Sequence, residues 1–269
     1  MHIPSAIQTF DLTRRFGDIV ALDHMNLTVE TGKMFGLLGP NGAGKSTAIK
    51  ILTTLLEPSA GSAKVGGFDI ERDPSGVRAH IGYVPQMLSA DGALTGRENL
   101  LLSARMYGIP RSERKERIRE MLLFMQLEEM ADKLVKKYSG GMIRRLELAQ
   151  AMLHRPIVLF LDEPTIGLDP MARRMVWDHL KNLRNEYRLT VLITTHDMEE
   201  ADSLCDELVF LHRGKVVAGG CPAELKSLIG PNADLNDVFD YFSGAFLTAE
   251  GEGGYRDVRR TRNAASRHS

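Results

Sequence analysis

Three segments of the chain are dominated by apolar residues: Met34–Leu38, Ile157–Leu161 and Leu189–Thr195. Near-continuous apolar runs are typical of strands in a parallel sheet, which is buried on both faces. The first run leads through a glycine-rich turn into a helical pattern over Ser46–Leu56, which ends before Pro58. The pattern therefore predicts an α/β fold built around a buried sheet.

Short strands are expected at Ala63–Ile70 and His80–Val84, and from residue 87 to the second run the pattern is helical. Glu98–Tyr107 is leucine-rich and ends at Gly108, and a further helix is expected after Ser139. Between these two helices, apolar residues fall at i, i+3, i+4 and i+7 on one helix face: Ile118, Met121, Leu122 and Met125. We expect residues 87–154 to form a helical subdomain inserted into an α/β core of residues 1–86 and 155–220.

The two ends of the chain carry weaker patterns. Ala6–Leu12 and Ile19–Val29 are expected to be strands joined by the polar turn Thr13–Asp18. Near the other end, Asp234 is a candidate cap for a short helix that closes a C-terminal extension, residues 221–242. From 243 to 269 glycine, alanine and arginine dominate, so we expect disorder. This basic tail could touch anionic lipid or RNA, but a solvated tail is the simpler interpretation.

Composition excludes several classes of protein. The chain has 269 residues and a formal net charge of −1, so no global basic field indicates nucleic acid as a main partner. Its two cysteines, Cys205 and Cys221, form no disulfide framework or metal cluster pattern. No run approaches the roughly 18 apolar residues of a membrane span, and the N-terminus lacks a signal-peptide pattern. We therefore expect a cytosolic protein, or one held at a membrane by another protein.

The segment after the first apolar run matches the phosphate-loop pattern G-x-x-x-x-G-K-S/T. Glycines let successive backbone N–H groups point at phosphate oxygens, the lysine adds a positive charge, and the hydroxyl can bind Mg²⁺. The strand before the loop and the helix after it are the context that the motif requires. The expected nucleotide-binding residues are Gly39, Pro40, Asn41, Gly42, Ala43, Gly44, Lys45, Ser46 and Thr47.

An acidic pair, Asp162 and Glu163, ends the second apolar run. Beside a phosphate loop, one such carboxylate can hold Mg²⁺ and the next can polarise an attacking water. The alternative is an ordinary helix N-cap, which is disfavoured because Pro164 follows and the strand before the pair is wholly apolar. The pair therefore indicates a second part of the nucleotide site.

A further segment, Tyr138-Ser-Gly-Gly-Met142, precedes a helix, and we call residues 138–142 the signature segment. With it, the chain resembles the ATP-binding subunits of ABC transporters over about residues 5–220. The resemblance implies a P-loop NTPase fold: a RecA-like core with an antiparallel β subdomain, and an inserted α-helical subdomain. It also implies ATP and Mg²⁺ as the bound groups.

The signature segment would supply a second anion site, from Ser139 and the backbone amides of Gly140 and Gly141 at a helix N-terminus. A single copy has no obvious use for two phosphate sites. The resemblance implies that the signature segment of one subunit closes on ATP held by the phosphate loop of a second, in a head-to-tail dimer of this chain.

The resemblance assigns catalytic and metal-binding roles residue by residue. Asp162 matches the aspartate that holds Mg²⁺ together with Ser46, and Glu163 matches the catalytic glutamate. Gln86 matches a glutamine that contacts Mg²⁺ and water and reports to the membrane subunit, and His196 matches the histidine that contacts the γ-phosphate. Taken alone, Gln86 and His196 would be an ordinary loop residue and a structural histidine.

Two more residues match at the edges of the site. Phe16 matches the aromatic that stacks on adenine, where the family more often has tyrosine, and Asp169 matches an aspartate at the dimer interface. A core-filling aromatic and a loop polar residue are the plain alternatives. Because all of these residues occur together in the expected order, the plain alternatives are disfavoured.

Two departures narrow the resemblance. The signature segment has Tyr138 and Met142 where its best-known form has leucine and glutamine, while the serine and both glycines are present. With Thr194-Thr-His-Asp-Met-Glu-Glu-Ala201, this variant resembles the drug- and antibiotic-exporter branch, which uses separate membrane subunits. Residues after Gln86, including Met87, Leu88 and Leu94, are candidates to contact such a subunit or simply to pack between subdomains.

The resemblance therefore implies an ATPase subunit on the cytoplasmic face of the membrane, which powers transport, in the export direction, through an integral membrane permease. A soluble ABC-type ATPase acting on ribosomes or nucleic acid is the alternative. It is disfavoured because the chain lacks a second cassette, coiled-coil insertions and zinc motifs. A regulatory subunit without hydrolysis is disfavoured because Lys45, Glu163 and His196 are all present.

Overall fold

A computed structural model describes residues 5–248 of the chain. A four-stranded antiparallel sheet, in the order β2-β1-β4-β5, holds the N-terminal strands β1 (Ser5–Phe16) and β2 (Ile19–Glu30). It is completed by β4 (Ala60–Val65) and β5 (Phe68–Asp69). The strand β1 continues four residues beyond Leu12, because Arg14, Arg15 and Phe16 still pair with β2, so the expected turn shrinks to two residues.

A six-stranded sheet, in the order β10-β9-β3-β8-β7-β6, forms the centre of the molecule. Its strands are β3 (Met34–Leu38), β6 (Ile81–Val84), β7 (Val158–Asp162), β8 (Thr190–Thr195), β9 (Glu207–His212) and β10 (Lys215–Gly220). All neighbours are parallel except β9 and β10, which form an antiparallel hairpin. The three apolar runs are thus the buried strands β3, β7 and β8.

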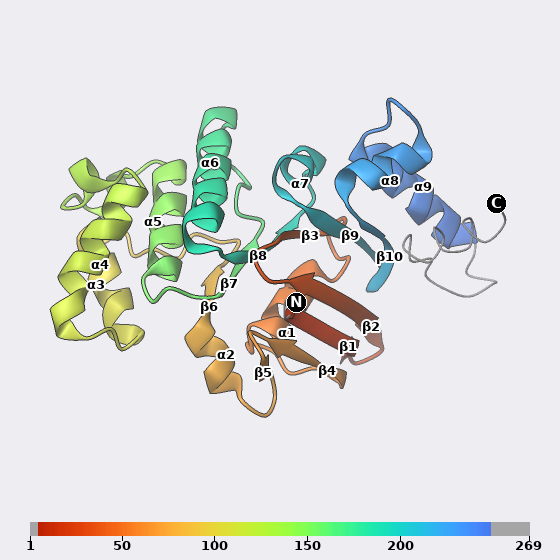
Figure 1. The fold of residues 1–269 in the computed structure, drawn as a ribbon, viewed down its shortest axis with the longest axis horizontal. Helices are drawn as coiled ribbons and strands as arrows, with labels where there is room; N and C mark the ends of the chain where they lie inside the picture. The colour runs from red at the N-terminus through yellow and green to blue at the C-terminus, as the bar shows by residue number, and fades with distance from the viewer. Residues whose placement is uncertain (1–4, 249–269) are drawn as a thin grey trace.

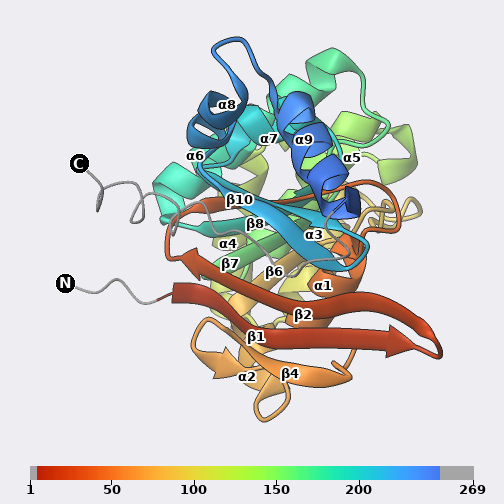
Figure 2. The same cartoon turned by 90° about the vertical axis from the view of Figure 1, so that its right-hand side faces the viewer.

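Alternate residues of these strands face two different cores. In β7, Val158 and Phe160 pack with the helix α1 (Lys45–Leu52) and the four-stranded sheet, whereas Leu159 and Leu161 pack with helices on the other face. The layers are therefore antiparallel sheet, α1, central sheet and outer helices, which Figure 2 shows from the side of β10. This arrangement confirms the predicted α/β fold.

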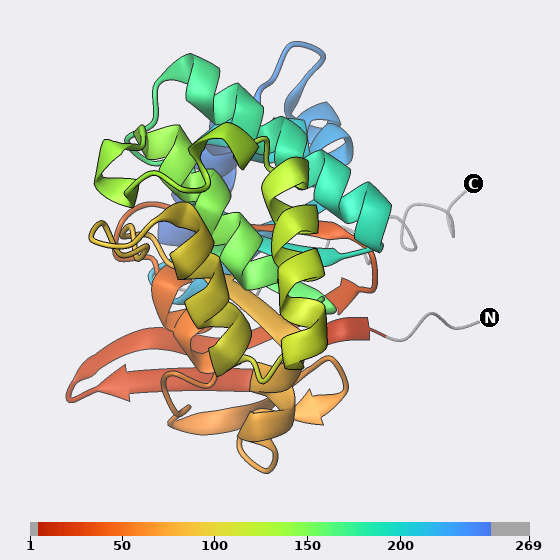
Figure 3. The ribbon, with the colours of Figure 1, turned by 90° about the vertical axis from the view of Figure 1, so that its left-hand side faces the viewer.

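The helical subdomain is built from α3 (Gly96–Met106), α4 (Arg111–Phe124) and α5 (Gly140–Met152), with two short 3₁₀ turns, Glu128–Met130 and Val135–Lys137. Thr95 and Glu98 form a reciprocal capping box at the start of α3. Figure 3 shows these helices beside α6 (Pro170–Tyr187) on one side of the molecule. The predicted insertion of helices between β6 and β7 is thereby observed.

Sequence patterns missed two short helices, α2 (Pro74–His80) and α8 (Pro222–Ile229), each of which has proline at its first position. A further short helix, α7 (Met198–Leu204), follows β8. The last helix, α9 (Leu235–Thr248), begins at the expected Asp234 cap but continues past Ser243, where we expected disorder. Residues 249–269 of the expected tail lie outside the described residues. Over 5–248, no helix is both long and apolar enough to cross a membrane.

Candidate nucleotide-binding and hydrolysis site

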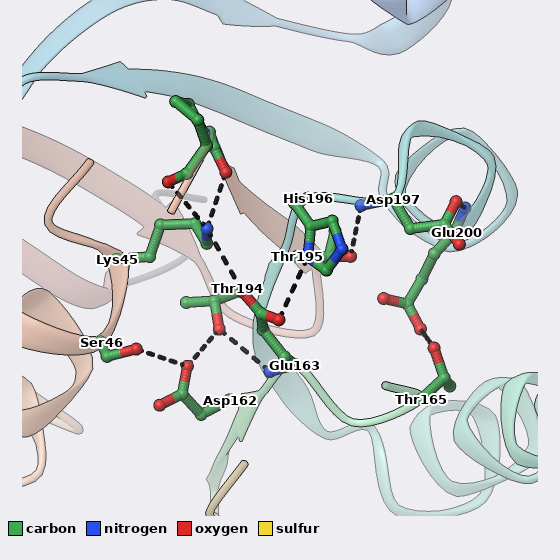
Figure 4. Close-up of polar contacts among 12 residues, drawn as sticks. Lys45, Ser46, Asp162, Glu163, Thr165, Thr194, Thr195, His196, Asp197 and Glu200 are labelled. Carbon is green, nitrogen blue, oxygen red and sulfur yellow. Dashed lines mark hydrogen bonds and ion pairs between the residues drawn. The ribbon is translucent and has the colours of Figure 1, made fainter. Parts of the chain in front are cut away.

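The candidate site lies where three adjacent strands end. In the central sheet β8 lies between β3 and β7, with Leu38 opposite Thr195 and Asp162 opposite Thr194. Ligands of open parallel sheets bind at these carboxyl ends. Three segments far apart in the sequence, the phosphate loop, the acidic pair and the His196 loop, therefore meet at one edge (Figure 4).

The phosphate loop requires glycine at two positions. Gly39 has φ 152°, and a Cβ there would lie 2.2 Å from the carbonyl oxygen of Leu211. Gly44 has φ 109°, and a Cβ there would lie 2.4 Å from the carbonyl oxygen of Ala21. Any larger residue would push the loop off β9 or β2. The tip of the loop, at Asn41 and Gly42, is exposed, so an anion can reach the backbone amides.

Lys45 is buried, with 4% of its side chain exposed. Its ammonium group donates to the carbonyl oxygens of Gly39 at 2.7 Å and Pro40 at 3.2 Å, and lies 3.3 Å from Glu163 Oε1. A buried ammonium needs such partners. The positive charge is thus held inside the loop, next to the acidic pair.

Ser46 and Asp162 form a set of oxygen atoms suited to Mg²⁺. Ser46 Oγ donates to Asp162 Oδ1 at 3.1 Å, and the buried Thr194 hydroxyl donates to the same oxygen at 2.6 Å. Hydroxyl and carboxylate oxygens are the ligands that Mg²⁺ prefers, and Mg²⁺ usually takes only one or two carboxylates plus phosphate and water. Consistent with this, residues 5–248 contain no group of three or more His, Cys, Asp or Glu side chains that could hold a metal by itself.

Glu163 joins Lys45 to His196. Its Oε2 lies 3.1 Å from His196 Nδ1, and its Oε1 faces Lys45. Its backbone has φ 48°, in the left-handed region that non-glycine residues rarely adopt. Hydrogen bonds from its N–H to the carbonyl oxygen and the hydroxyl of Thr194 hold it there. Since no helix begins at Pro164, the helix-cap alternative is wrong. The carboxylate is instead directed into the site.

A pocket of about 150 Å³ opens beside Glu163 and His196. It ends at Glu200 of α7, whose Oε1 accepts hydrogen bonds from the Thr165 hydroxyl at 2.7 Å and the Trp177 indole at 3.0 Å. Burial raises the pKa of Glu200, although these hydrogen bonds oppose the shift. Nearby, burial and the charge of Asp162 raise the pKa of Tyr83 to about 12, so this phenol stays neutral.

Sequence reasoning did not single out Thr194, Thr165, Trp177 or Glu200 as site residues. Thr194 and Glu200 belong to the 194–201 segment that marks the exporter branch, but that pattern assigns neither of them a place in the site. Thr165 and Trp177 contact Glu200 across separations of 35 and 23 residues, which a linear pattern does not record.

The remaining predicted site residues lie outside this cluster. Phe16 ends β1, is 46% exposed, and has the Arg14 guanidinium 4.6 Å from its ring centre. Gln86 follows β6 at the same edge of the sheet and is exposed. Asp169 caps α6 by accepting a hydrogen bond from the Ala172 N–H at 2.9 Å, a structural role in this chain.

The signature segment lies at the N-terminus of α5, which stands apart from α1 in Figure 1. Ser139 caps this helix and is exposed, as is Gly140. Gly141 packs against α6: a Cβ there would lie 2.9 Å from the Cβ of Ala172. Two of the three groups thus face solvent. One copy presents its phosphate loop and its signature segment at separate places.

Chemically, the cluster can bind a phosphate chain at the loop and a divalent cation at Ser46 and Asp162. Glu163 is positioned to polarise a water, and His196 to hold Glu163 or a phosphate oxygen. These are the parts that phosphoryl transfer to water needs.

Sequence comparison agrees with this geometry. Residues 22–166 match the family model described as ABC transporter. The chain belongs to the ABC transporter family. It is 44% identical, over 84% of its length and 68% of the relative's, to the daunorubicin/doxorubicin resistance ATP-binding protein DrrA of Streptomyces peucetius. It is 40% identical, over 87% of its length and 74% of the relative's, to the Nod factor export ATP-binding protein I of Sinorhizobium fredii.

Solved structures of this family have the same fold. One described as an ATP-binding subunit of an ABC transporter superimposes with a TM-score of 0.78 at 29% identity, over 89% of this chain and all of the other. The dimeric ATP-binding cassette MJ0796, in a post-hydrolysis state with ADP and phosphate, gives 0.71 at 27% identity, over 80% of this chain and 98% of the other. The expected P-loop NTPase fold and the expected function as an ATP-binding, ATP-hydrolysing transporter subunit are confirmed, and the ribosomal or nucleic-acid alternative is not favoured.

Proposed function

We propose that this ABC transporter subunit binds MgATP between two copies of itself and powers export through a separate membrane permease, from the cytoplasmic face of the membrane. The observation that carries the proposal is the separation of the two anion sites in one copy. The phosphate loop has its charges buried and paired, whereas Ser139 and Gly140 are exposed at a helix N-terminus. A second copy, turned head to tail, brings the two together.

In this proposal each residue has one task. The phosphate-loop amides and Lys45 bind the β- and γ-phosphates, with Phe16 stacked on the adenine. Ser46 and Asp162 hold Mg²⁺, with Gln86 as a further contact. Glu163 polarises the attacking water. His196 orients the γ-phosphate, and the partner copy's signature serine closes the site, near Asp169 at the dimer interface.

The bound phosphate would replace contacts that the chain now makes internally. Lys45 is satisfied by Gly39, Pro40 and Glu163, so an incoming phosphate oxygen can take one of these places without leaving the ammonium unpaired. Release of Glu163 from Lys45 would leave its carboxylate free to accept a proton from water.

Export through a separate subunit is supported by the names of the relatives, which include a drug-resistance protein and a Nod factor exporter. The exposed apolar side chains of Met87 and Leu88, 81% and 50% exposed, follow Gln86 directly and suit a contact with such a subunit. Leu94 is half-buried and suits packing within the subdomain.

The dimer is tested in a background that binds ATP but does not turn it over. Glu163→Gln should elute as an ATP-dependent dimer in size-exclusion chromatography, because the sandwich cannot reopen by hydrolysis. Adding Ser139→Arg should return the protein to a monomer while ATP binding, measured by calorimetry, persists. Ser112→Arg, which adds the same charge on the exposed face of α4, is the control and should remain dimeric. A dimer that survives Ser139→Arg would contradict the composite site.

A further inference from the structure

Two charged side chains in α5, Arg144 and Glu147, are almost completely buried. Their ion pair is 2.9 Å long, and each side chain is 2% exposed. Burial of both charges is costly, and a pair of apolar residues of similar size is often equally stable. Stability of the helix therefore does not by itself account for this pair, and its other contacts indicate what it does.

The hydrogen bonds of the two side chains go to the loop that follows β6. Arg144 donates to the carbonyl oxygens of Pro85 at 2.7 Å and Gln86 at 2.9 Å. Glu147 Oε1 accepts hydrogen bonds from the N–H and the hydroxyl of Ser89, and from the N–H of Ala90 at 3.4 Å. One charge thus binds the start of the loop and the other binds its end. We call Arg144 and Glu147 the loop clamp.

The loop clamp holds backbone atoms and leaves side chains available. Gln86, Met87 and Leu88 are exposed, although the backbone on either side of them is fixed by charge-assisted hydrogen bonds. A loop held in this way can present its side chains to a metal site and to another protein without being free to fold away.

The neighbouring arginine has a different task. Arg145 is also buried, but its guanidinium donates to the carbonyl oxygens of Met125 and Gln126 at the end of α4. It therefore ties two helices of the subdomain together. Because Arg144 and Arg145 share a helix, a residue type and a buried position, Arg145 is a matched control for the loop clamp.

The loop clamp and the signature segment are on the same rigid element. At a rise of about 1.5 Å per residue, Arg144 lies only about 7 Å along the axis from Ser139. At the other end of α5, a Cβ at Gly82 of β6 would lie 2.6 Å from the carbonyl oxygen of Ala151. The helix α5 therefore contacts both β6 and the loop of Gln86, and its N-terminus carries Ser139, which is proposed to bind the partner copy's ATP.

We propose that Arg144 and Glu147 are positioning residues, which fix the loop of Gln86 to α5 so that Gln86 and the signature serine move as one unit. This inference rests on the proposed roles of Gln86 and Ser139. When the signature segment shifts onto a partner's ATP, the same movement of α5 carries Gln86 relative to Ser46 and Asp162. Signature contact and metal-site completion are thereby linked within one copy.

The test replaces both charges at once, since one variant alone would leave the other charge buried and unpaired. Arg144→Met/Glu147→Leu should raise the amide hydrogen-exchange rates of Ser89 and Ala90 about tenfold or more, because their acceptor is lost. The kcat for ATP should fall about tenfold while its KM changes less than about twofold, because the phosphate loop is untouched.

Arg145→Met is the control for a merely structural effect. It should lower the melting temperature without changing exchange at Ser89 and Ala90 or the kcat. Glu147→Gln keeps an acceptor oxygen and should retain most of the protection that Glu147→Ala loses. Both variants leave Arg144 without its counter-ion, so the difference between them reports the acceptor oxygen alone and keeps the test usable if the double variant does not fold.

Unchanged exchange in both the double variant and Glu147→Ala would overturn the proposal. Faster amide exchange at Ser89 and Ala90 in the double variant, with an unchanged kcat, would show that the loop clamp anchors the loop without positioning Gln86. That result would also overturn the proposal. A wild-type protein that retains Ser89 protection but does not hydrolyse ATP would instead count against the proposed function.

Discussion

The phosphate loop and the signature segment each lie at a helix N-terminus, but their surroundings differ. At the phosphate loop, Lys45 and Glu163 are buried and paired with each other, and the buried Asp162 accepts hydrogen bonds from Ser46 and Thr194. At the signature segment, Ser139 and Gly140 are exposed. The first region is complete within one copy. The second faces solvent.

This difference between the two regions indicates that nucleotide binding and the control of hydrolysis are located at different places in the molecule. A buried network of charges fixes its atoms before the nucleotide arrives, so little reorganisation is needed on binding. An exposed helix N-terminus gains its main interaction only when another molecule brings a charge to it. Under the proposed function, nucleotide binding is a property of one copy, while turnover requires the second copy.

Loss of the central charge should have the largest effect. Lys45→Ala removes the ammonium proposed to bind the phosphates and leaves Glu163 with only His196 beside it, so ATPase activity should fall by about 100-fold or more. Steady-state phosphate release measures this. Lys50→Ala, at an exposed position of the same helix, is the control and should leave the rate unchanged. Undiminished turnover in Lys45→Ala would refute the phosphate-loop assignment.

Removal of one buried hydroxyl should have an intermediate effect on the same region. Thr194→Val deletes the donor to Asp162 and the acceptor for the Glu163 N–H, so we expect about a tenfold lower kcat and a loss of stability of about 1–3 kcal/mol. Thr190→Val deletes a buried hydroxyl at the other end of β8, where it accepts a hydrogen bond from the Gly32 N–H. The control should lose comparable stability but keep its kcat. Equal kcat values in the two variants would contradict a role for Thr194 in the site.

The smallest expected effect is a change in how the free energy of unfolding depends on pH, and it concerns His154, which follows α5. His154 donates to the Ile81 carbonyl oxygen and stacks on Tyr107, and burial lowers its pKa. The unfolded chain therefore binds a proton more readily than the folded chain. The stability contribution is complete above the ordinary histidine pKa, near 6.5, and is lost as the pH falls from there towards the lower folded pKa.

His154→Gln keeps a donor but cannot titrate in this range. Denaturant unfolding followed between about pH 7.5 and 5 should show a shallower decline for this variant than for the wild type. Burial also lowers the pKa of His179, so part of the decline should remain. Identical slopes would show that His154 does not contribute.

The sequence determined the parts of this protein whose causes are local. The phosphate loop, the apolar strands β3, β7 and β8, and the Asp234 cap are written in consecutive residues, since glycine torsions, strand burial and caps depend on near neighbours. The short helices α2 and α8 were not predicted, because a helix of seven or eight residues has too few turns to give a periodic signal.

Only the tertiary structure decided which distant residues meet. It brought the Thr194 hydroxyl within hydrogen-bond distance of Asp162, and Glu200 within hydrogen-bond distance of Thr165 and Trp177. It also bonded Arg144 of the loop clamp to the carbonyl oxygen of Gln86. It also extended β1 to Phe16, since pairing with β2 can keep polar residues in a strand. Burial and partnership belong to the packed chain: the same Arg144 and Arg145 that stand side by side in the sequence are directed to different segments by the helix on which they lie.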